Sequence, residues 1–223
     1  MNITLLCNAG LALTYQKKTL LIDLPNCDLH PYYALPDETW QQILTLQAPY
    51  NDLCGLYFTH DHPDHCDLNK VQEFKSRQPE IPVSFPINYD ERGELQWGPF
   101  RIVYQSAPHT PLPFKEPPHR VTLVQAGETT VYIAGDAILT PDIHKEFLHG
   151  NVADIGIWNS MFLSRPETRS LLHQAAKETF IYHMPLPSTE DRGIWRKCNN
   201  NFQRHPEELK GIQVLDHYPA IIR

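Results

Sequence analysis

The sequence predicts an α/β fold in which two packed, mixed β-sheets are flanked by helices. Two observations support this prediction. Short apolar segments of strand length recur along the whole chain, and segments with helical periodicity lie between the later ones. The 223 residues are enough for one large core, and they contain no linker, repeat or low-complexity segment. We therefore expect a single domain over residues 1–223.

The composition is that of a globular protein and disfavours several kinds of partner. The formal charge of −7 argues against binding to long nucleic acid, because phosphate contacts need a basic surface. The five cysteines are scattered without a CxxC motif, which is typical of free thiols in a reducing compartment. No apolar run reaches the roughly 18–20 residues that a spanning helix needs. We expect a cytoplasmic protein with a small-molecule substrate and no membrane contact, while association into a homo-oligomer stays open.

The N-terminal part of the chain is predicted to begin as β-structure. Its apolar segments are short and are separated by turn residues, for example residues 8–10. Residues 24–36 are rich in proline and aromatic side chains, so we expect a loop there. Asp37 is expected to cap a helix over residues 38–46. The strands expected in this part lie at residues 3–6, 12–15, 19–23 and 54–58.

The middle of the chain is predicted to contain one helix and several strands. Three apolar residues at helical spacing predict a helix over residues 68–76. A Gly-Pro pair is expected to form the turn between two strands within residues 94–104, and residues 126–128 the turn of a hairpin. A proline-rich loop should extend to residue 118. The other strands expected here lie at residues 81–85, 121–125 and 129–134.

The last third is predicted to alternate helices with strands. Thr140 and Pro141 suit the N-cap and first position of a helix that should end near Gly150. Ser188 and Asp191 have the spacing of a capping box for a helix that extends to about residue 202. Another helix is expected at residues 166–177, and strands at residues 154–158, 179–182 and 212–215.

Residues 59–67, with the sequence THDHPDHCD, follow the expected strand at 54–58 directly. Six of these nine residues can bind a metal ion through nitrogen or oxygen. In extended chain His60, His62 and Asp64 point to one side, since strand side chains alternate, whereas His65 points to the other. This spacing suits two adjacent metal pockets better than one. A polar turn without metal would rarely gather so many ligands.

Four other expected strands also end in a residue that can bind metal, and these residues converge if the strand ends share one edge of a sheet. Each has a plainer interpretation when taken alone. Asp136 could be a turn or helix-entry residue, His183 a core histidine, and His119 is a rival to His109. We expect Asp23 to accept the second N–H of a metal-binding histidine rather than to bind metal itself. The four strand-end residues are Asp23, His109, Asp136 and His183.

These residues together resemble the signature of the metallo-β-lactamase-fold hydrolase superfamily. The resemblance rests on the HxHxDH motif and three later residues: His60, His62, Asp64, His65, His109, Asp136 and His183. Residues 20–23 resemble the early strand of the family that ends in aspartate, and residues 132–136 resemble its strand-Gly-Asp motif. The match spans roughly residues 3–183. It implies an αβ/βα four-layer sandwich with the site at one edge of the sheets.

The resemblance also implies two divalent metal ions, zinc in the first place, with iron or manganese as alternatives. The implied ligands are His60, His62 and His109 for one ion, and Asp64, His65 and His183 for the other, with Asp136 bridging. Asp64 and Asp136 are the expected catalytic residues. A metal-bound hydroxide would attack the substrate, and the metal ions would stabilise the developing negative charge.

The single-domain build is similar to the small hydrolases of the lactonase and tRNA-processing branches, which favours a phosphodiester or a lactone as substrate. Three alternatives stay open: a thioester or amide hydrolase of the same fold, a non-catalytic metal-binding sensor or scaffold, and a single-iron sulfur oxygenase. A diiron oxygen reductase is disfavoured because no glutamate replaces His62. The chain has no room for the extra nuclease domain of some RNA-processing members.

The substrate is expected to contact the loops at residues 24–36 and 110–118. Candidates for lining the pocket are Tyr32, Tyr33, Phe114 and Trp158, although packing is the expected role of each taken singly. His119 is a weak candidate for the proton donor to the leaving group, with a surface histidine as the alternative. Cys66 is expected to be a buried small residue and not a nucleophile.

Overall fold

Two mixed β-sheets pack face to face in the computed structural model, which describes residues 1–111 and 116–223. In spatial order the first sheet consists of β13 (Ala220–Ile221), β1 (Asn2–Cys7), β2 (Gly10–Tyr15), β3 (Lys18–Ile22), β4 (Leu53–Tyr57) and β5 (Val83–Ser84). The second sheet consists of β12 (Gln213–Val214), β11 (Ala176–Tyr182), β10 (Ala153–Asn159), β9 (Thr129–Ile133), β8 (Arg120–Ala126), β7 (Phe100–Ser106) and β6 (Arg92–Trp97).

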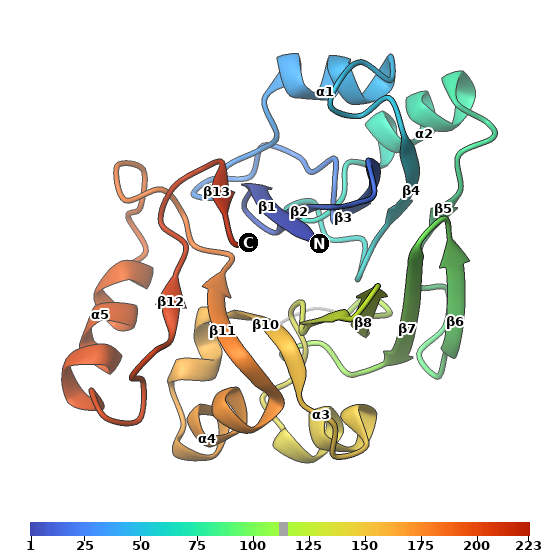
Figure 1. Ribbon diagram of the computed structural model, residues 1–223. Coiled ribbons are helices and arrows are strands. Elements are labelled where there is room, and N and C mark those ends of the chain that lie inside the picture. The colour runs from blue at the N-terminus through green and yellow to red at the C-terminus, as the bar shows by residue number, and fades with distance from the viewer. Residues whose placement is uncertain (112–115) are drawn as a thin grey trace.

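Helices cover the outer faces of both sheets. They are α1 (Asp37–Leu44), α2 (Leu68–Arg77), α3 (Pro141–Leu148), the 3-10 helix η1 (Ser160–Leu163), α4 (Pro166–Ala175) and α5 (Ile194–Arg204). Figure 1 shows α1 and α2 over the first sheet and α3 and α4 over the second, so the layers follow the predicted αβ/βα order. Among the described residues, no helix combines the length and apolar character that crossing a membrane requires.

The side chains of β3 illustrate how the sequence distributes residues between the layers. Leu20 and Ile22 belong to the core between the two sheets, whereas Leu21 packs in the core under α1 and α2. All three are fully buried, because neighbouring strand residues point to opposite faces and both faces are covered. In α2, Val71 and Phe74 lie three residues apart on the face that packs on this sheet.

The strand directions bring several strand ends to one edge of each sheet. β10 runs parallel to β9 and β11, and β7 has the same direction because two antiparallel pairings, through β8, connect it to β9. In the first sheet β1, β3 and β4 share one direction for the same reason. The C-terminal ends of these seven strands are the places where α/β folds usually position their sites.

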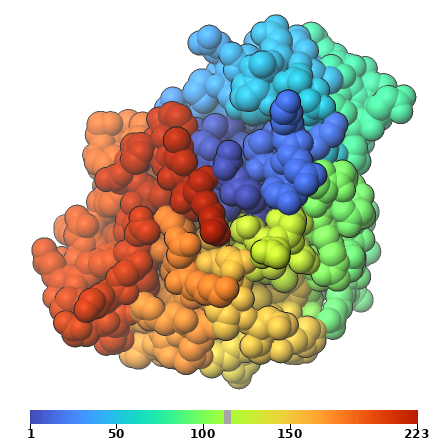
Figure 2. All heavy atoms as spheres, in the orientation of Figure 1, coloured from blue at the N-terminus to red at the C-terminus, as the bar shows by residue number. Residues whose placement is uncertain are grey.

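The N-terminal and C-terminal strands pair with each other at the edge of the first sheet. β13 is antiparallel to β1, with Leu5 opposite Ala220. Figure 2 shows the C-terminal segment lying against the N-terminal strands on this face. β13 was not predicted, because its two residues follow a Tyr-Pro pair and are too few to show the alternating pattern of a strand.

Two of the predicted helix starts are wrong. Asp37 is the first helical residue of α1, the N-cap is Pro36, and no side chain caps this helix. The capping box of Ser188 and Asp191 does not form, because α5 begins only at Ile194 after the N-cap Gly193. Glu190 takes over the capping role, and its carboxylate accepts the backbone N–H groups of Ile194 and Trp195.

The ends of two other elements also differ from the prediction. α4 ends at Ala175 and β11 begins at the next residue, so the predicted helix at 166–177 is two residues too long and the predicted strand at 179–182 too short. α1 ends at Leu44 and not at residue 46, because Leu46 adopts a positive φ of 51°. The prediction also missed η1, which directly follows β10.

Candidate metal centre

All seven predicted metal ligands lie together at the C-terminal ends of the strands. Their possible ligand atoms form three groups, and within each group the atoms are no more than 4.8 Å apart. The groups are His60, His62 and His109; His60, His65 and Asp136; and Asp64, His65 and His183. The first and third groups match the two ligand sets that the sequence resemblance implies. The second group contains Asp136, the residue that the resemblance makes a bridge.

The loop after β4 folds so that its ligands face two ways. The backbone N–H groups of His65 and Cys66 both donate to the carbonyl of His62, which closes a tight turn. Asp64 and His65 therefore both join His183 instead of the group around His62, so the expectation that Asp64 points to the same side as His60 and His62 is wrong. Asp67 ends the loop as the N-cap of α2, where its carboxylate accepts the N–H groups of the first helical turn.

Asp23, at the end of β3, anchors the histidines from behind. Its carboxylate is fully buried and accepts the N–H and the hydroxyl of Thr59, each at 2.7 Å. It also accepts the Nδ1–H of His65 at 2.9 Å, so the predicted contact between Asp23 and a ligand-type histidine is confirmed. Since the Thr59 hydroxyl donates to Asp23, its oxygen is the acceptor for His60 Nδ1 at 3.0 Å.

These hydrogen bonds fix which nitrogen of each ring faces the centre. In His60 and His65 the proton lies on Nδ1, and in His109 it donates from Nδ1 to the carbonyl of Thr110 at 2.6 Å. The Nε2 atoms of His60 and His109 are buried and have no hydrogen-bond partner among the described residues. The ring of His62 stands edge-on to both, with centroids 4.7 Å from each. Buried lone pairs without a donor are rare, and a cation at this point would satisfy them.

The other ligand group is crowded in a way that also suits a cation. His183 Nε2 lies 3.0 Å from His65 Nε2 and 3.1 Å from Asp64 Oδ2. Burial raises the pKa of Asp64, but the hydrogen bond to His183 and the charge of His65 outweigh it and lower the pKa to about 2. Burial beside other imidazoles lowers the pKa of His60 well below its usual range, which keeps it in the neutral form that binds metals.

Asp136 lies between the two groups. Its Oδ2 is 3.7 Å from His109 Nε2 in one group, and 3.7 Å from His65 Nε2 and 3.6 Å from His183 Nε2 in the other. Its second oxygen, Oδ1, lies 3.3 Å from the amide nitrogen of Asn159, which is within reach of a weak hydrogen bond. The carboxylate can therefore present one oxygen to both ligand groups while the other is held from the side.

His119 lies behind the centre, and the prediction of a surface histidine is wrong. It is buried, and its Nε2 accepts the backbone N–H of Asp136 at 3.0 Å. Burial, with the charge of nearby His109, lowers the pKa of His119 to about 3, which favours its neutral form. Gly135 has a φ of +57°, and a Cβ there would lie only 2.4 Å from His119 Nε2, which explains the glycine before Asp136.

Sequence reasoning missed two asparagines that support the centre. Asn8 follows β1, and its amide nitrogen donates to the carbonyl of Asp64 at 3.2 Å and lies 3.4 Å from His183 Nε2. Asn159 ends β10 and donates to the carbonyl of Gly135 at 3.0 Å. Both stand at strand ends, as the predicted ligands do. A position at a strand end therefore indicates residues that orient metal ligands as well as residues that bind metal.

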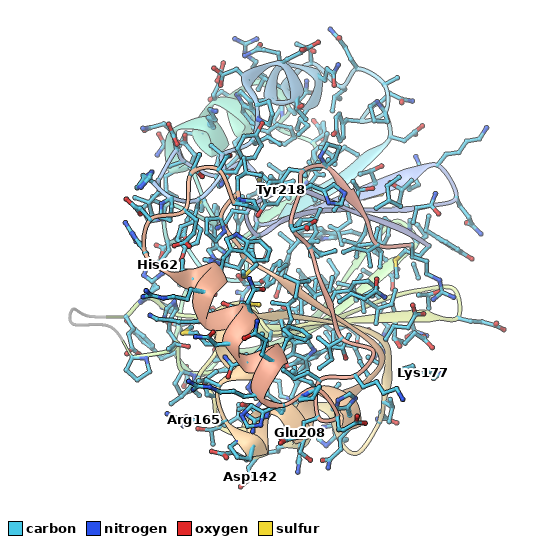
Figure 3. The ribbon with its side chains drawn as sticks, turned by 90° about the vertical axis from the view of Figure 1, so that its left-hand side faces the viewer. His62, Asp142, Arg165, Lys177, Glu208 and Tyr218 are labelled. Carbon is cyan, nitrogen blue, oxygen red and sulfur yellow. The ribbon has the colours of Figure 1, made fainter. Side chains whose placement is uncertain are left out.

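A cavity of about 660 Å³ opens over the ligand groups and includes His62, Asp64, His109, Asp136 and His183 in its lining. This volume is typical of a small-molecule site. Figure 3 shows His62 beside α5, the helix that forms one wall of the cavity.

Of the three predicted lining residues that the structure describes, only Tyr32 borders this cavity, edge-on to His183 at 4.6 Å. Tyr33 stacks on Tyr218, and Trp158 is fully buried in the core of the second sheet. Phe114 lies outside the described residues. Packing is therefore the right prediction for Tyr33 and Trp158 and the wrong one for Tyr32.

No protein-family model matches the sequence, and no curated protein matches it. Solved structures do match the fold. An isothiocyanate hydrolase from Delia radicum gut bacteria superposes with a TM-score of 0.66 at 16% identity, over 100% of this chain and 99% of its own. The metallo-β-lactamase fold protein YhfI from Bacillus subtilis gives 0.63 at 16% identity, over 96% and 90%. CmlA, a diiron β-hydroxylase from Streptomyces venezuelae, gives 0.66 at 15% identity in an E377D mutant form.

The fold and the ligand cluster together define the class: this chain has the metallo-β-lactamase fold, as the sequence resemblance predicted. The match covers 99% of the isothiocyanate hydrolase but only 53% of CmlA, which is about twice as long as this chain. At these identities the similarity concerns the fold.

Proposed function

We propose that this chain is a hydrolase that depends on two divalent metal ions and cleaves a small ester-type substrate. The proposed ligands are His60, His62 and His109 for one ion, and Asp64, His65 and His183 for the other, with Asp136 between them. Two of the three groups of close ligand atoms have this membership, and the Asp136 carboxylate lies within 3.7 Å of both. Imidazole with carboxylate suits zinc, and also iron or manganese.

The observation that carries the proposal is the pair of buried, unpartnered Nε2 atoms on His60 and His109. Their Nδ1 protons are committed to Thr59 and Thr110, so each ring offers a lone pair to the centre and has no proton to donate there. Leaving two such lone pairs unpaired in a closed site would cost about 1–3 kcal/mol each. A divalent cation at this point removes that cost, and the residues present therefore fit the proposed ions.

The protein's own groups prepare the chemistry. Divalent ions in such a site lower the pKa of water and stabilise negative charge on a substrate oxygen. Asp136 is placed to hold the two ligand groups in a fixed relation, and it is itself held by Asn159 and by His119, which accepts its backbone N–H. Asp64 stays ionised because its pKa is lowered to about 2. Burial raises the pKa of Asp136, but the charge of His183 and the hydrogen bond to His65 outweigh it and hold that pKa well below its usual range, so both acids would serve as charged ligands over the pH range in which the enzyme would work.

The substrate class is proposed from the cavity and from the resemblance. A cavity of about 660 Å³ admits a small molecule and not a folded partner. Phosphodiesters and lactones come first, and thioesters and amides second. A chromogenic panel with one member of each class, assayed with the metal found in the protein, separates them. Iron in the protein together with consumption of oxygen would instead point to oxygenase chemistry, as the name of CmlA describes for that protein.

The first experiment is elemental analysis of the purified protein. We expect about two transition-metal ions per chain, and fewer ions with lower turnover in Asp136→Asn. A matched control is Asp61→Asn, because Asp61 lies in the same loop but is exposed and belongs to none of the ligand groups. This variant should keep the metal content of the wild type. A protein that binds no metal after careful reconstitution contradicts the proposal.

His62→Ala separates an enzyme from a sensor. A variant that stays folded, as judged by circular dichroism, and loses all turnover supports the hydrolase. A wild type that binds two ions but turns over no member of the panel favours the sensor or scaffold.

A further inference from the structure

Three basic side chains line the cavity, although the protein as a whole is acidic with a formal charge of −7. Arg165 stands just after η1, Arg192 precedes α5, and Lys197 lies within α5. Figure 3 shows Arg165 on the same side of the molecule as His62 but well apart from it, with α5 alongside both. Arg165 thus lies apart from His62 within the same cavity.

Carboxylates of the cavity lining do not pair with these charges. Among the described residues, the carboxylates that line the cavity are Asp64 and Asp136, which belong to the ligand groups. Within residues 1–111 and 116–223, Arg165 and Lys197 make no ion pair, and Arg192 donates to the backbone carbonyl of His30 at 2.8 Å.

The acids nearest in sequence to Arg192 are engaged elsewhere. Glu190 accepts the backbone N–H groups at the start of α5, and Asp191 lies 3.0 Å from His30 Nε2. Neither lines the cavity. An anion that entered the cavity would therefore meet three cations, and the carboxylates among the described lining residues are those of the ligand groups.

Apolar side chains also line the cavity. They are Leu29, Tyr32, Leu139, Met161 and Ile194, and small polar residues such as Ser160 and Ser164 lie among the lining residues as well. Such a surface suits a ligand that has an apolar or weakly polar segment beside its charged group.

We propose that the substrate carries a second anionic group, a carboxylate or a phosphate monoester, which Arg165, Arg192 and Lys197 bind while the scissile bond lies at the metal ligands. This inference rests on the proposed hydrolase function for the identity of the reacting end, but the anion subsite itself stands on the charges of the cavity. It narrows the substrate to an amphipathic acid that carries an ester, lactone or phosphodiester bond apart from its acidic group.

The test uses three substrates that differ only in their tail: the mono(4-nitrophenyl) ester of glutaric acid, the analogue with a terminal carboxamide, and the analogue with a terminal phosphate monoester. The same tails on a 4-nitrophenyl phosphodiester serve if that bond class is the one cleaved. We expect the metal-loaded wild type to favour an acidic tail by about tenfold in kcat/KM, the scale of one charge-assisted hydrogen bond. The preference between carboxylate and phosphate identifies which anion the subsite takes.

The variants Arg165→Gln, Lys197→Gln and their double combination should bring this preference towards unity, chiefly through KM. The matched control is Arg196→Gln. Arg196 is the residue before Lys197 on α5, and it is exposed and does not line the cavity. This control should keep the preference of the wild type. A wild type without preference overturns the subsite and leaves the hydrolase proposal intact. A preference that survives in a triple variant, in which Arg192→Gln is added to the other two changes, comes from the metal centre itself and also overturns the subsite.

If the metal-loaded protein cleaves none of these compounds and no member of the chromogenic panel, the hydrolase proposal fails, and the subsite is decided by binding alone. Glutaranilic acid and its terminal amide, which lack an activated bond, are then compared by isothermal titration against wild type, double variant and Arg196→Gln. Tighter binding of the acid that is lost only in the double variant supports the subsite. Equal affinity for acid and amide overturns it.

Discussion

Replacing Asp23 with asparagine tests whether strand-end hydrogen bonds hold the histidines in place. The carboxylate accepts three bonds: from the N–H of Thr59 at Oδ1, and from the Thr59 hydroxyl and His65 Nδ1 at Oδ2. An amide has one oxygen and one NH2 group. In its best orientation the amide oxygen keeps the two bonds at the Oδ2 position, and the NH2 group meets the Thr59 N–H, where two donors face each other.

The size of the effect follows from this count. One lost bond with an unpaired buried donor costs about 1–3 kcal/mol, and two bonds that change from charged to neutral weaken by about 1 kcal/mol each. The sum is about 3–5 kcal/mol, a large share of the roughly 5–15 kcal/mol that keep a domain folded. Because the bond that sets the tautomer of His65 changes from charged to neutral, we expect zinc affinity to fall by about 10–100-fold.

The assay combines urea unfolding of the metal-free protein with zinc titration against a chromophoric chelator. Asp61→Asn is the control, since it makes the same chemical change in the loop after β4 at an exposed position. The reasoning is refuted if Asp23→Asn unfolds at the same urea concentration as this control and binds zinc with the same affinity.

Two further predictions concern the backbone and the surface. Gly135→Ala should destabilise the fold by clearly more than Gly150→Ala. Both glycines have a positive φ, but only at Gly135 would a new Cβ meet a neighbour, His119 Nε2 at 2.4 Å. Equal unfolding midpoints of the two variants would contradict this. The hydrogen bonds of Lys177 and Thr130 lower the pKa of Asp154, so its contribution to stability is present above the unfolded pKa and is lost as the pH falls through the folded pKa. Asp154→Asn should therefore unfold more easily than wild type at neutral pH and like it in strong acid, which urea titrations at several pH values will measure.

The layers and the ligand cluster could be predicted because they depend on local patterns. The run of Leu20, Leu21 and Ile22 is apolar at every position, which marks a strand covered on both faces. A strand that gives way to polar residues likewise places those residues at an edge of the sheet. The metal-type side chains among them, such as Asp136 and His183, could therefore be found from the sequence.

The features that were missed depend on tertiary structure. His119 follows a proline-rich stretch, and its sequence context does not indicate burial. In the fold it is buried, and its ring accepts the backbone N–H of Asp136. Asn8 acts on a histidine 175 positions away, and no local pattern records that contact. At the start of α5 the Glu190 carboxylate accepts two backbone N–H groups. The capping box expected from the sequence began at Ser188 instead.

The pairing of β13 with β1 has a consequence for the order in which the protein can fold. The ribosome makes β1 among the first strands and β13 only after almost all of the described chain. Until then, one edge of β1 has open N–H and C=O groups that a strand of another chain could pair with. Asn8 follows β1 and contacts Asp64 and His183, so its side chain takes its final position only when that sheet is formed. A nascent chain that is stalled late in synthesis would thus combine an exposed sheet edge with an unfinished metal centre, and chaperone dependence at that stage is the expected result.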